Sequence, residues 1–171
     1  AFRTNRRFHL LADNMPAQAH ALSVLAHRFA ASPAAVSALA AFETRFSDNP
    51  LVLDKWLALN AVAPDGAVVD RMKAILAAPD FPNSNPNRLR ALLSTFGMSN
   101  PTQFARADGA GFRFLAEAVA DIDTRNPQVA ARVLTAFRVW RGYETGRRAE
   151  AEKALVALRD AGSLSRNTED I

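Results

Sequence analysis

Apolar residues recur along this chain at intervals of three and four positions, the spacing that places side chains on one face of a helix. Within residues 66–78 such a stripe is formed by Val68, Val69, Met72, Ile75 and Leu76. Two more stripes of this kind lie in 111–122 and 128–141. No segment alternates cleanly between strand-forming apolar and polar residues, so the pattern predicts helices and no sheet.

Asparagine–proline pairs mark the expected beginnings of several helices. They occur at 49–50, 85–86, 100–101 and 126–127, and Ser32–Pro33 has the same form. An asparagine side chain accepts a hydrogen bond from a free N–H of the first turn. Proline suits the first helical position, where an N–H has no partner in the helix. Pairs and stripes together predict helices near 16–31, 33–47, 50–62, 66–78, 86–96, 110–122, 127–141 and 145–160.

Helices of this length joined by short loops form antiparallel neighbours. The expected fold class is all-α, a right-handed superhelix or α-solenoid of antiparallel helix pairs of the ARM or HEAT kind, with about eight helices. A closed helical bundle is the alternative. No strict repeat period and no linker-like stretch divides the sequence, so residues 1–171 are expected to form a single helical domain.

The composition is that of a globular domain and excludes several kinds of site. The chain has 171 residues, of which 49% are apolar and 22% charged, which is enough apolar material for a core. It has no cysteine, which excludes disulfides, a thiol nucleophile and thiolate metal ligands. No apolar run approaches the length that spans a membrane, so no membrane partner is expected.

The basic charge comes almost entirely from arginine. The formal net charge is +4, and the only lysines are Lys55, Lys73 and Lys153. Arginine suits phosphate recognition because its planar fork donates two parallel hydrogen bonds. Here the arginines are spread along the chain, and only 6–7 and 147–148 are adjacent pairs. We therefore expect solvated helix faces and no nucleic-acid partner.

No metal site is expected in this chain. Its histidines are His9, His20 and His27. None belongs to an HExxH motif, so they are interpreted as surface residues. The segment 121–123 superficially resembles the start of a calcium loop, but Arg125 and Pro127 stand where ligands and a turn glycine are needed.

The sequence contains no recognisable catalytic motif either. Gly109 and Gly111 precede a predicted helix, which could expose amides to a phosphate, but no strand precedes them and no Walker lysine follows. We favour a plain helix start with Asp108 as a local cap. No serine has GxSxG or SxxK surroundings, so no catalytic residue is predicted.

Several segments resemble one protein family in its own order along the chain. The sequence has NPLVLDKWLALN at 49–60, a PDF…NPNRLRAL stretch at 79–92, FARADGAGFRF at 104–114, RNPQVAAR at 125–132 and WRGY at 140–143. These are similar to the segments NPLVxDKWxxLQA, HPxFxxxNPNxxRxLxxxF, FHxxDGSGYxF, NPQVAxR and RRYD of bacterial aminopeptidase N. Three loop positions depart from the family pattern, namely Ala105, Ala110 and Phe112, so that loop is given no contact role.

The resemblance implies the C-terminal helical domain of a zinc aminopeptidase, which removes N-terminal residues from peptides. The family's zinc motif HExxH and its substrate motif GxMEN do not occur here. The resemblance therefore implies that zinc is bound by a separate catalytic domain and that this piece alone is inactive. The implied partners are the catalytic and β-sandwich domains and peptide substrates, and the implied location is the cytoplasm. A stand-alone helical-repeat module that binds a protein or nucleic acid is the alternative.

The resemblance also implies a substrate channel. In the family this domain covers the active site and encloses a cavity that peptides cross to reach the zinc. By position, the channel residues of this chain are Arg90, Gln128 and Arg132. An arginine fork suits a peptide's terminal carboxylate, and Gln128 and Arg132 are four apart on one helix face. Alternatively, both arginines pair with carboxylates inside the domain.

Overall fold

In the computed structural model, the described residues are 14–30, 32–162 and 164–171, and every regular element among them is a helix. The expected segment near 2–12 and His9 lie outside the described residues. The elements are α2 (Met15–Phe29), α3 (Pro33–Arg45), α4 (Pro50–Ala61), α5 (Val68–Ala77), α6 (Pro86–Leu89), the π-helix η1 (Arg90–Ser94), α7 (Thr95–Ser99), α8 (Pro101–Phe104), α9 (Ala110–Asp123), α10 (Pro127–Leu134), the 3₁₀-helix η2 (Thr135–Gly142), α11 (Thr145–Asp160) and α12 (Arg166–Glu169).

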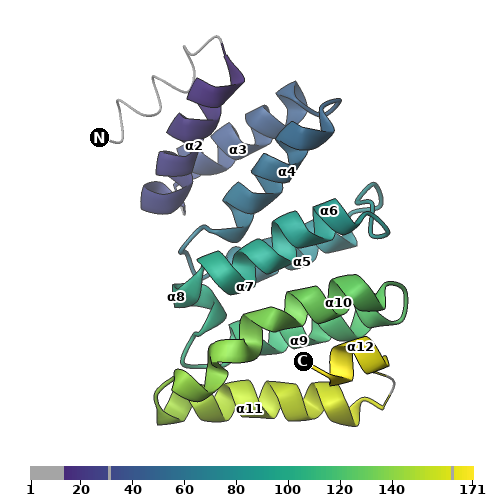
Figure 1. The fold of residues 1–171 in the computed structure, drawn as a ribbon. Helices are drawn as coiled ribbons and strands as arrows, with labels where there is room; N and C mark the ends of the chain where they lie inside the picture. Colours follow the sequence, from purple (N-terminus) through teal and green to yellow (C-terminus); the bar gives the residue numbers. More distant parts are fainter. Residues whose placement is uncertain (1–13, 31, 163) are drawn as a thin grey trace.

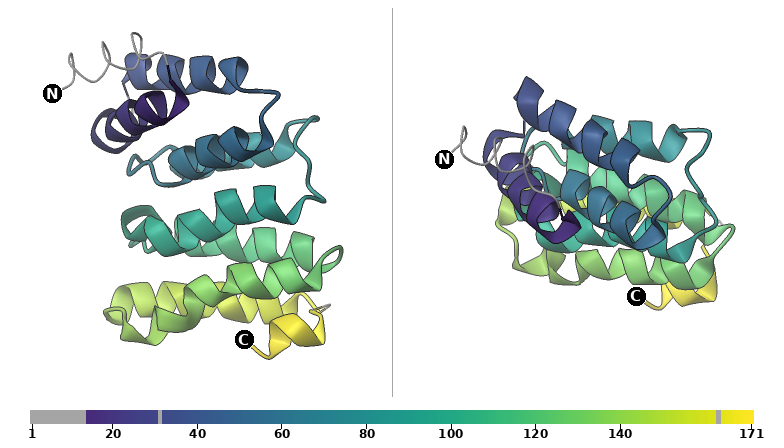
Figure 2. Two further views of the ribbon diagram at one scale, coloured as in Figure 1. Left: turned by 45° about the horizontal axis from the view of Figure 1, so that its top comes forward. Right: turned by 90° about the horizontal axis from the view of Figure 1, so that it is seen from above.

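The helices stack in chain order as two parallel rows (Figure 1). One row consists of α4, the continuous helix α6–η1–α7, α10 and α12, and its neighbours contact one another through α4 and η1, η1 and α10, and α10 and α12. The other row consists of α3, α5, α9 and α11. In Figure 2 the helices form successive layers, and the first and last layers lie at opposite ends of the molecule without closing on each other. This arrangement confirms the predicted all-α solenoid of stacked helix pairs and not the closed bundle.

Every predicted Asn–Pro or Ser–Pro start is a real helix start. The Asn126 side chain accepts a hydrogen bond from the Val129 N–H at 3.2 Å, and Ser32 accepts one from Ala35 at 3.2 Å. Asn14, Asn49, Asn85 and Asn100 cap their helices in the same way. The caps depend only on residues two to three positions apart, which is why the sequence predicts them.

Two predicted helices are less regular than expected. The helix predicted at 86–96 extends to Ser99 and contains a π segment, in which the Thr95 N–H bonds the Arg90 carbonyl five residues back. The helix predicted at 127–141 tightens into a 3₁₀-helix after Leu134. Buried residues still recur three or four positions apart through both segments, so the apolar stripe does not report the change of helix type. The short helix α12 is additional to the prediction, and α8 begins at the predicted Asn100–Pro101 start but has no counterpart among the predicted helix ranges.

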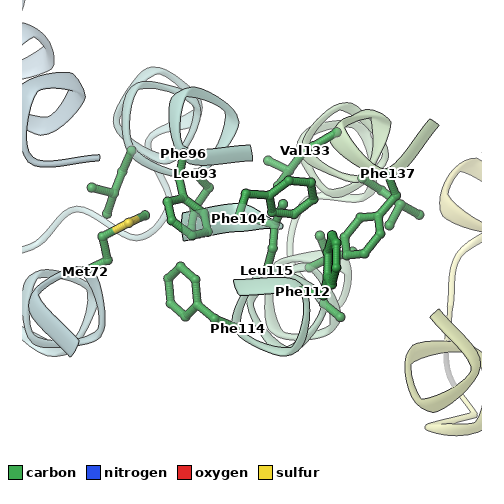
Figure 3. Close-up of a cluster of buried hydrophobic side chains, with 14 of the residues drawn as sticks. Met72, Leu93, Phe96, Phe104, Phe112, Phe114, Leu115, Val133 and Phe137 are labelled. Atoms are coloured by element: carbon green, nitrogen blue, oxygen red, sulfur yellow. The ribbon is translucent and has the colours of Figure 1, made fainter. Parts of the chain in front are cut away.

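The buried side chains form two separate clusters. The N-terminal core consists of Leu22, Leu25, Ala35, Ala38, Leu39, Phe42 and Val52. The much larger C-terminal core is centred on the phenylalanines Phe96, Phe104, Phe112, Phe114 and Phe137 (Figure 3). Within it, Phe104 meets Phe96, Phe112 and Phe137 edge to face, with ring centroids 6.0, 4.9 and 5.3 Å away. Trp56 on α4 packs against both cores and joins them.

Candidate functional site

The three predicted channel residues lie on neighbouring helices of the same row. Arg90 is the first residue of the π segment η1, and Gln128 and Arg132 are on α10. Since α10 and η1 contact each other, the structure brings the three residues onto adjacent elements of the row formed by α6–η1–α7 and α10 (Figure 1).

Gln128 and Arg132 form an exposed polar strip on α10. The opposite face of that helix is buried and consists of Val129, Ala130, Val133 and Leu134. Because the apolar face fixes the rotation of the helix, the two polar side chains four positions apart both face outward. Within the described residues neither side chain has a hydrogen bond or an ion pair. Gln128 is also in the first turn, where the helix dipole favours an anion.

Arg90 is half-buried and held by its own helix turn. Its Nε donates to the Pro86 carbonyl oxygen at 3.3 Å, and a terminal nitrogen donates to Asn87 Oδ1. These acceptors are neutral, so the positive charge of the guanidinium is not compensated by a carboxylate in either contact. The turn therefore orients Arg90 and leaves its charge available to an anion.

Arg88, two residues earlier, has a structural role that the sequence does not reveal. It is only 7% exposed, donates to the Pro50 carbonyl at 2.8 Å and pairs with Asp54. This contact joins α6 to α4 across 34 positions of the sequence. The neighbouring Leu89 is also buried. An apolar residue next to Arg88 is the only local hint in the sequence that this part of the helix is buried.

Seven arginines of the described part of the chain, Arg88 among them, form ion pairs. Ion pairs in the described part of the chain involve Arg71, Arg88, Arg106, Arg113, Arg125, Arg147 and Arg159. Each of these charges is offset by a nearby carboxylate. The arginine excess therefore contributes less free positive charge than the composition alone implies.

The aspartates of the segment that resembles a calcium-loop start have structural roles. Asp121 pairs with Arg125, and Asp123 is buried and accepts hydrogen bonds from Ser165 and Thr168. His20 and His27 are exposed on α2. The described residues contain no group of three or more His, Asp or Glu side chains placed to hold a metal ion.

The glycine turn is a helix start, as predicted. Asp108 accepts a hydrogen bond from the Ala110 N–H at 3.0 Å, and Gly109 has a φ of 70°, a conformation that favours glycine. The hydrogen bond from Ala110 and the ion pair with Arg106 lower the pKa of the Asp108 carboxyl. A Cβ at Gly111 would lie 2.2 Å from the Gln103 carbonyl oxygen, so close packing explains this glycine.

A hollow that was not predicted lies elsewhere among the described residues. It has a volume of about 390 Å³ and lies between α3, α4, α5, α6 and the loop after α5, with Trp56, Ile75 and Phe81 in its wall. Glu43 and Asp80 also line it. Burial raises the pKa of the Glu43 carboxyl, and the nearby Asp80 carboxylate raises it further. Its residues come from segments distant in sequence, so no local motif announces it.

Among the described residues, no helix has the length and apolar character that a bilayer crossing requires.

Comparison with known proteins identifies the family to which the chain belongs. The chain matches, over residues 5–171, the family model described as "Domain of unknown function (DUF3458_C) ARM repeats". The aminopeptidase N of Escherichia coli (strain K12) is 35% identical over 162 residues, which cover 94% of this chain and 18% of that protein. The aminopeptidase N of Caulobacter vibrioides is 43% identical over 107 residues, which cover 63% of this chain and 12% of that protein.

A solved structure shows the same architecture. The crystal structure of Legionella pneumophila aminopeptidase A in complex with aspartic acid aligns with a TM-score of 0.89 and 28% identity, covering 99% of this chain and 20% of that one. This chain thus spans less than a fifth of the curated relatives it matches. These findings confirm the resemblance deduced from the motifs. The chain belongs to the DUF3458_C ARM-repeat family and is similar over nearly its whole length to the C-terminal helical domain of bacterial aminopeptidase N.

Proposed function

We propose that this chain is the domain that covers the active site of a zinc-dependent aminopeptidase and lines the channel by which peptides enter. The observation that carries the proposal is the match of almost the entire chain to part of an aminopeptidase, with a TM-score of 0.89. The catalytic and β-sandwich domains of the complete protein are its proposed partners, and the cytoplasm is its proposed location. A cover of this kind excludes water from the site and strengthens electrostatic interactions inside it.

The catalytic zinc belongs to the rest of the complete protein in this proposal. The described residues do not fit a zinc site, because no three potential ligands come together. We expect the purified 171-residue chain to hydrolyse no aminoacyl anilide at stoichiometric zinc. Hydrolysis by the chain that is abolished by a chelator and restored by zinc would contradict this assignment.

Arg90, Gln128 and Arg132 are the proposed contacts to the peptide's far end. The exposed, unpaired Arg132 and the first-turn position of Gln128 support this role, because both favour binding of a carboxylate. Arg90 adds a guanidinium on the neighbouring helix, already oriented by Pro86 and Asn87. The three residues together form an anion-binding strip across two helices.

The test is a substrate-length series on the complete protein that contains this domain. We expect Arg132→Ala to raise KM about tenfold or more for peptides of three or more residues, because a charge-assisted hydrogen bond contributes roughly 1.5–3 kcal/mol. The KM for a single-residue anilide, which has no terminal carboxylate to bind, should stay unchanged. Arg148→Ala is the control, since Arg148 is also an exposed arginine but lies on α11. Equal changes for both substrate types would overturn the channel role.

A further inference from the structure

The hollow between α3 and α5 has the features of a binding site that the proposed channel does not use. One of its lining residues is Trp56 of α4, which packs against both cores. The Trp56 Nε1–H donates to the Leu39 carbonyl oxygen at 3.0 Å, which fixes the indole in place. Since Ile75 and Phe81 add apolar surface beside it, the wall offers a rigid apolar contact of the kind that ligand pockets have.

The charges around the hollow are unequal. Arg71 and Arg88 both line it, but Arg71 pairs with Asp65 at 2.9 Å and Arg88 pairs with Asp54. Glu43 and Asp80 also line it, and within the described residues neither has an ion pair. Both arginines thus have a carboxylate partner outside the lining, whereas Glu43 and Asp80 are the charged residues of the lining that have no ion pair in the described part of the chain.

The two carboxylates also act on each other. Glu43 comes from the last turns of α3 and Asp80 from the loop after α5, so the fold brings them to one opening from different elements. Partial burial raises the pKa of the Glu43 carboxyl, and repulsion by the Asp80 carboxylate adds to this. A bound cation would relieve this repulsion, because it supplies the opposite charge that neither carboxylate has.

We propose that this hollow binds the basic side chain of a peptide, an arginine or a lysine. The methylene stem lies against Trp56, Ile75 and Phe81, and the cationic head lies between Glu43 and Asp80. A long basic side chain combines an apolar stem with a charged end, which matches an apolar wall with an acidic opening. The indole adds a cation–π contribution when the cation lies over its face. A volume of about 390 Å³ is within the range of small-ligand pockets.

This inference does not depend on the proposed aminopeptidase role, because it uses only contacts within this chain. The test uses the 171-residue chain and the capped peptide acetyl-Ala-Arg-Ala-amide. The matched neutral peptide has citrulline in place of arginine, which keeps the size and removes the charge. Binding is followed by the indole N–H signal of Trp56 in a Trp140→Phe background, which leaves one tryptophan of the two.

We expect saturable shifts of the Trp56 signal with the arginine peptide and at least threefold weaker binding of the citrulline peptide. Glu43→Gln and Asp80→Asn should each weaken binding of the arginine peptide about threefold, the size expected for a partly exposed ion pair. Both residues are exposed, so neither substitution removes a core contact. The control Glu152→Gln changes an exposed carboxylate on α11 and should leave binding unchanged.

Three results would overturn the inference. The first is equal binding of the arginine and citrulline peptides, and the second is binding that is insensitive to both Glu43→Gln and Asp80→Asn. The third is the absence of any shift at millimolar peptide in a chain whose amide spectrum shows it to be folded. None of these results bears on the channel residues Arg90, Gln128 and Arg132, so the two proposals fail independently.

Discussion

The two ends of the solenoid are built from different side chains. The N-terminal core, under α2 and α3, consists of alanine, leucine and valine with one phenylalanine, Phe42. The C-terminal core contains five interlocking phenylalanines and reaches from α4 to α11 (Figure 3). Since large aromatic side chains bury the most apolar area, the C-terminal part is expected to be the more stable region.

This difference corresponds to a division of roles. The proposed channel residues lie on η1 and α10, which are anchored in the C-terminal core through Leu92, Leu93 and Val133. The hollow proposed to bind a basic side chain lies at the junction of the two cores, where Trp56 is shared. The channel residues thus belong to the C-terminal core region, and the hollow belongs to the junction of the two cores.

The largest expected effect is the loss of an aromatic ring from the C-terminal core. Phe104→Ala should lower the free energy of unfolding by about 3–5 kcal/mol, because it leaves a cavity at the centre of the phenylalanine cluster. Urea denaturation measures the loss of free energy of unfolding, and hydrogen exchange shows which helices it affects. We expect protection to fall across α7, α9 and η2 together.

The matched change in the N-terminal core is Phe42→Ala, also a buried phenylalanine at 2% exposure. Its effect should concentrate in α2 and α3, with protection of α9 and α10 retained. If Phe42→Ala instead lowered protection uniformly along the chain, the two cores would be one cooperative unit and the comparison would be wrong.

The second effect concerns the buried carboxylate that holds the end of the described chain. Asp123, 3% exposed, accepts hydrogen bonds from the Ser165 N–H at 2.6 Å and the Ser165 hydroxyl at 2.7 Å, and a third from Thr168. Asp123→Ala should cost about 2–3 kcal/mol, since donors to a charged group lose their partner. In hydrogen exchange, the amides of α12 should lose protection before those of α10. Urea denaturation should show the lower free energy of unfolding.

The same group predicts a pH dependence. Burial alone would raise the pKa of the Asp123 carboxyl, but the hydrogen bonds from Ser165 and Thr168 lower it below its ordinary value. Its stabilising effect is therefore fully present above the pKa of an unfolded aspartate, roughly 3.9, and is lost as the pH falls through the lower folded pKa. The stability gap between the native chain and Asp123→Asn should shrink on acidification. A gap that widened at low pH would contradict this assignment.

The smallest effects come from the helix caps. Asn126→Ala removes the cap of α10 and should cost about 1 kcal/mol of global stability, because α10 belongs to the C-terminal core. Asn14→Ala removes the same kind of cap from α2, where the Ala17 N–H bonds Asn14 at 2.9 Å. We expect that change to fray α2 locally and to alter the global midpoint less. Thermal denaturation of the two variants, compared directly, checks the difference.

Local chemistry explains which features the sequence predicted. The caps and the apolar stripes involve residues two to four positions apart, so they can be recognised in the sequence. The helices and their stacking in pairs follow from them. The channel positions were placed by the family resemblance, and only their exposure and neighbours come from the structure.

Contacts between distant residues explain what the sequence did not predict. Asn100 illustrates this limit, because beyond its local cap it donates to the Ala61 and Ala63 carbonyls, 39 and 37 positions away. Asp123 and Ser165 are 42 positions apart, and the wall of the hollow comes from four helices, α3, α4, α5 and α6, and the loop after α5. Such contacts form only when the helices pack, so no local spacing encodes them.

The most direct test of the proposed channel role is a crystal structure of the complete protein with a short peptide bound at its proposed zinc site. We predict the peptide's terminal carboxylate within hydrogen-bond distance of the Arg132 guanidinium, with Gln128 or Arg90 as a second donor. A bound peptide whose carboxylate points away from α10 and η1, with Arg132 directed into bulk solvent, would contradict the account.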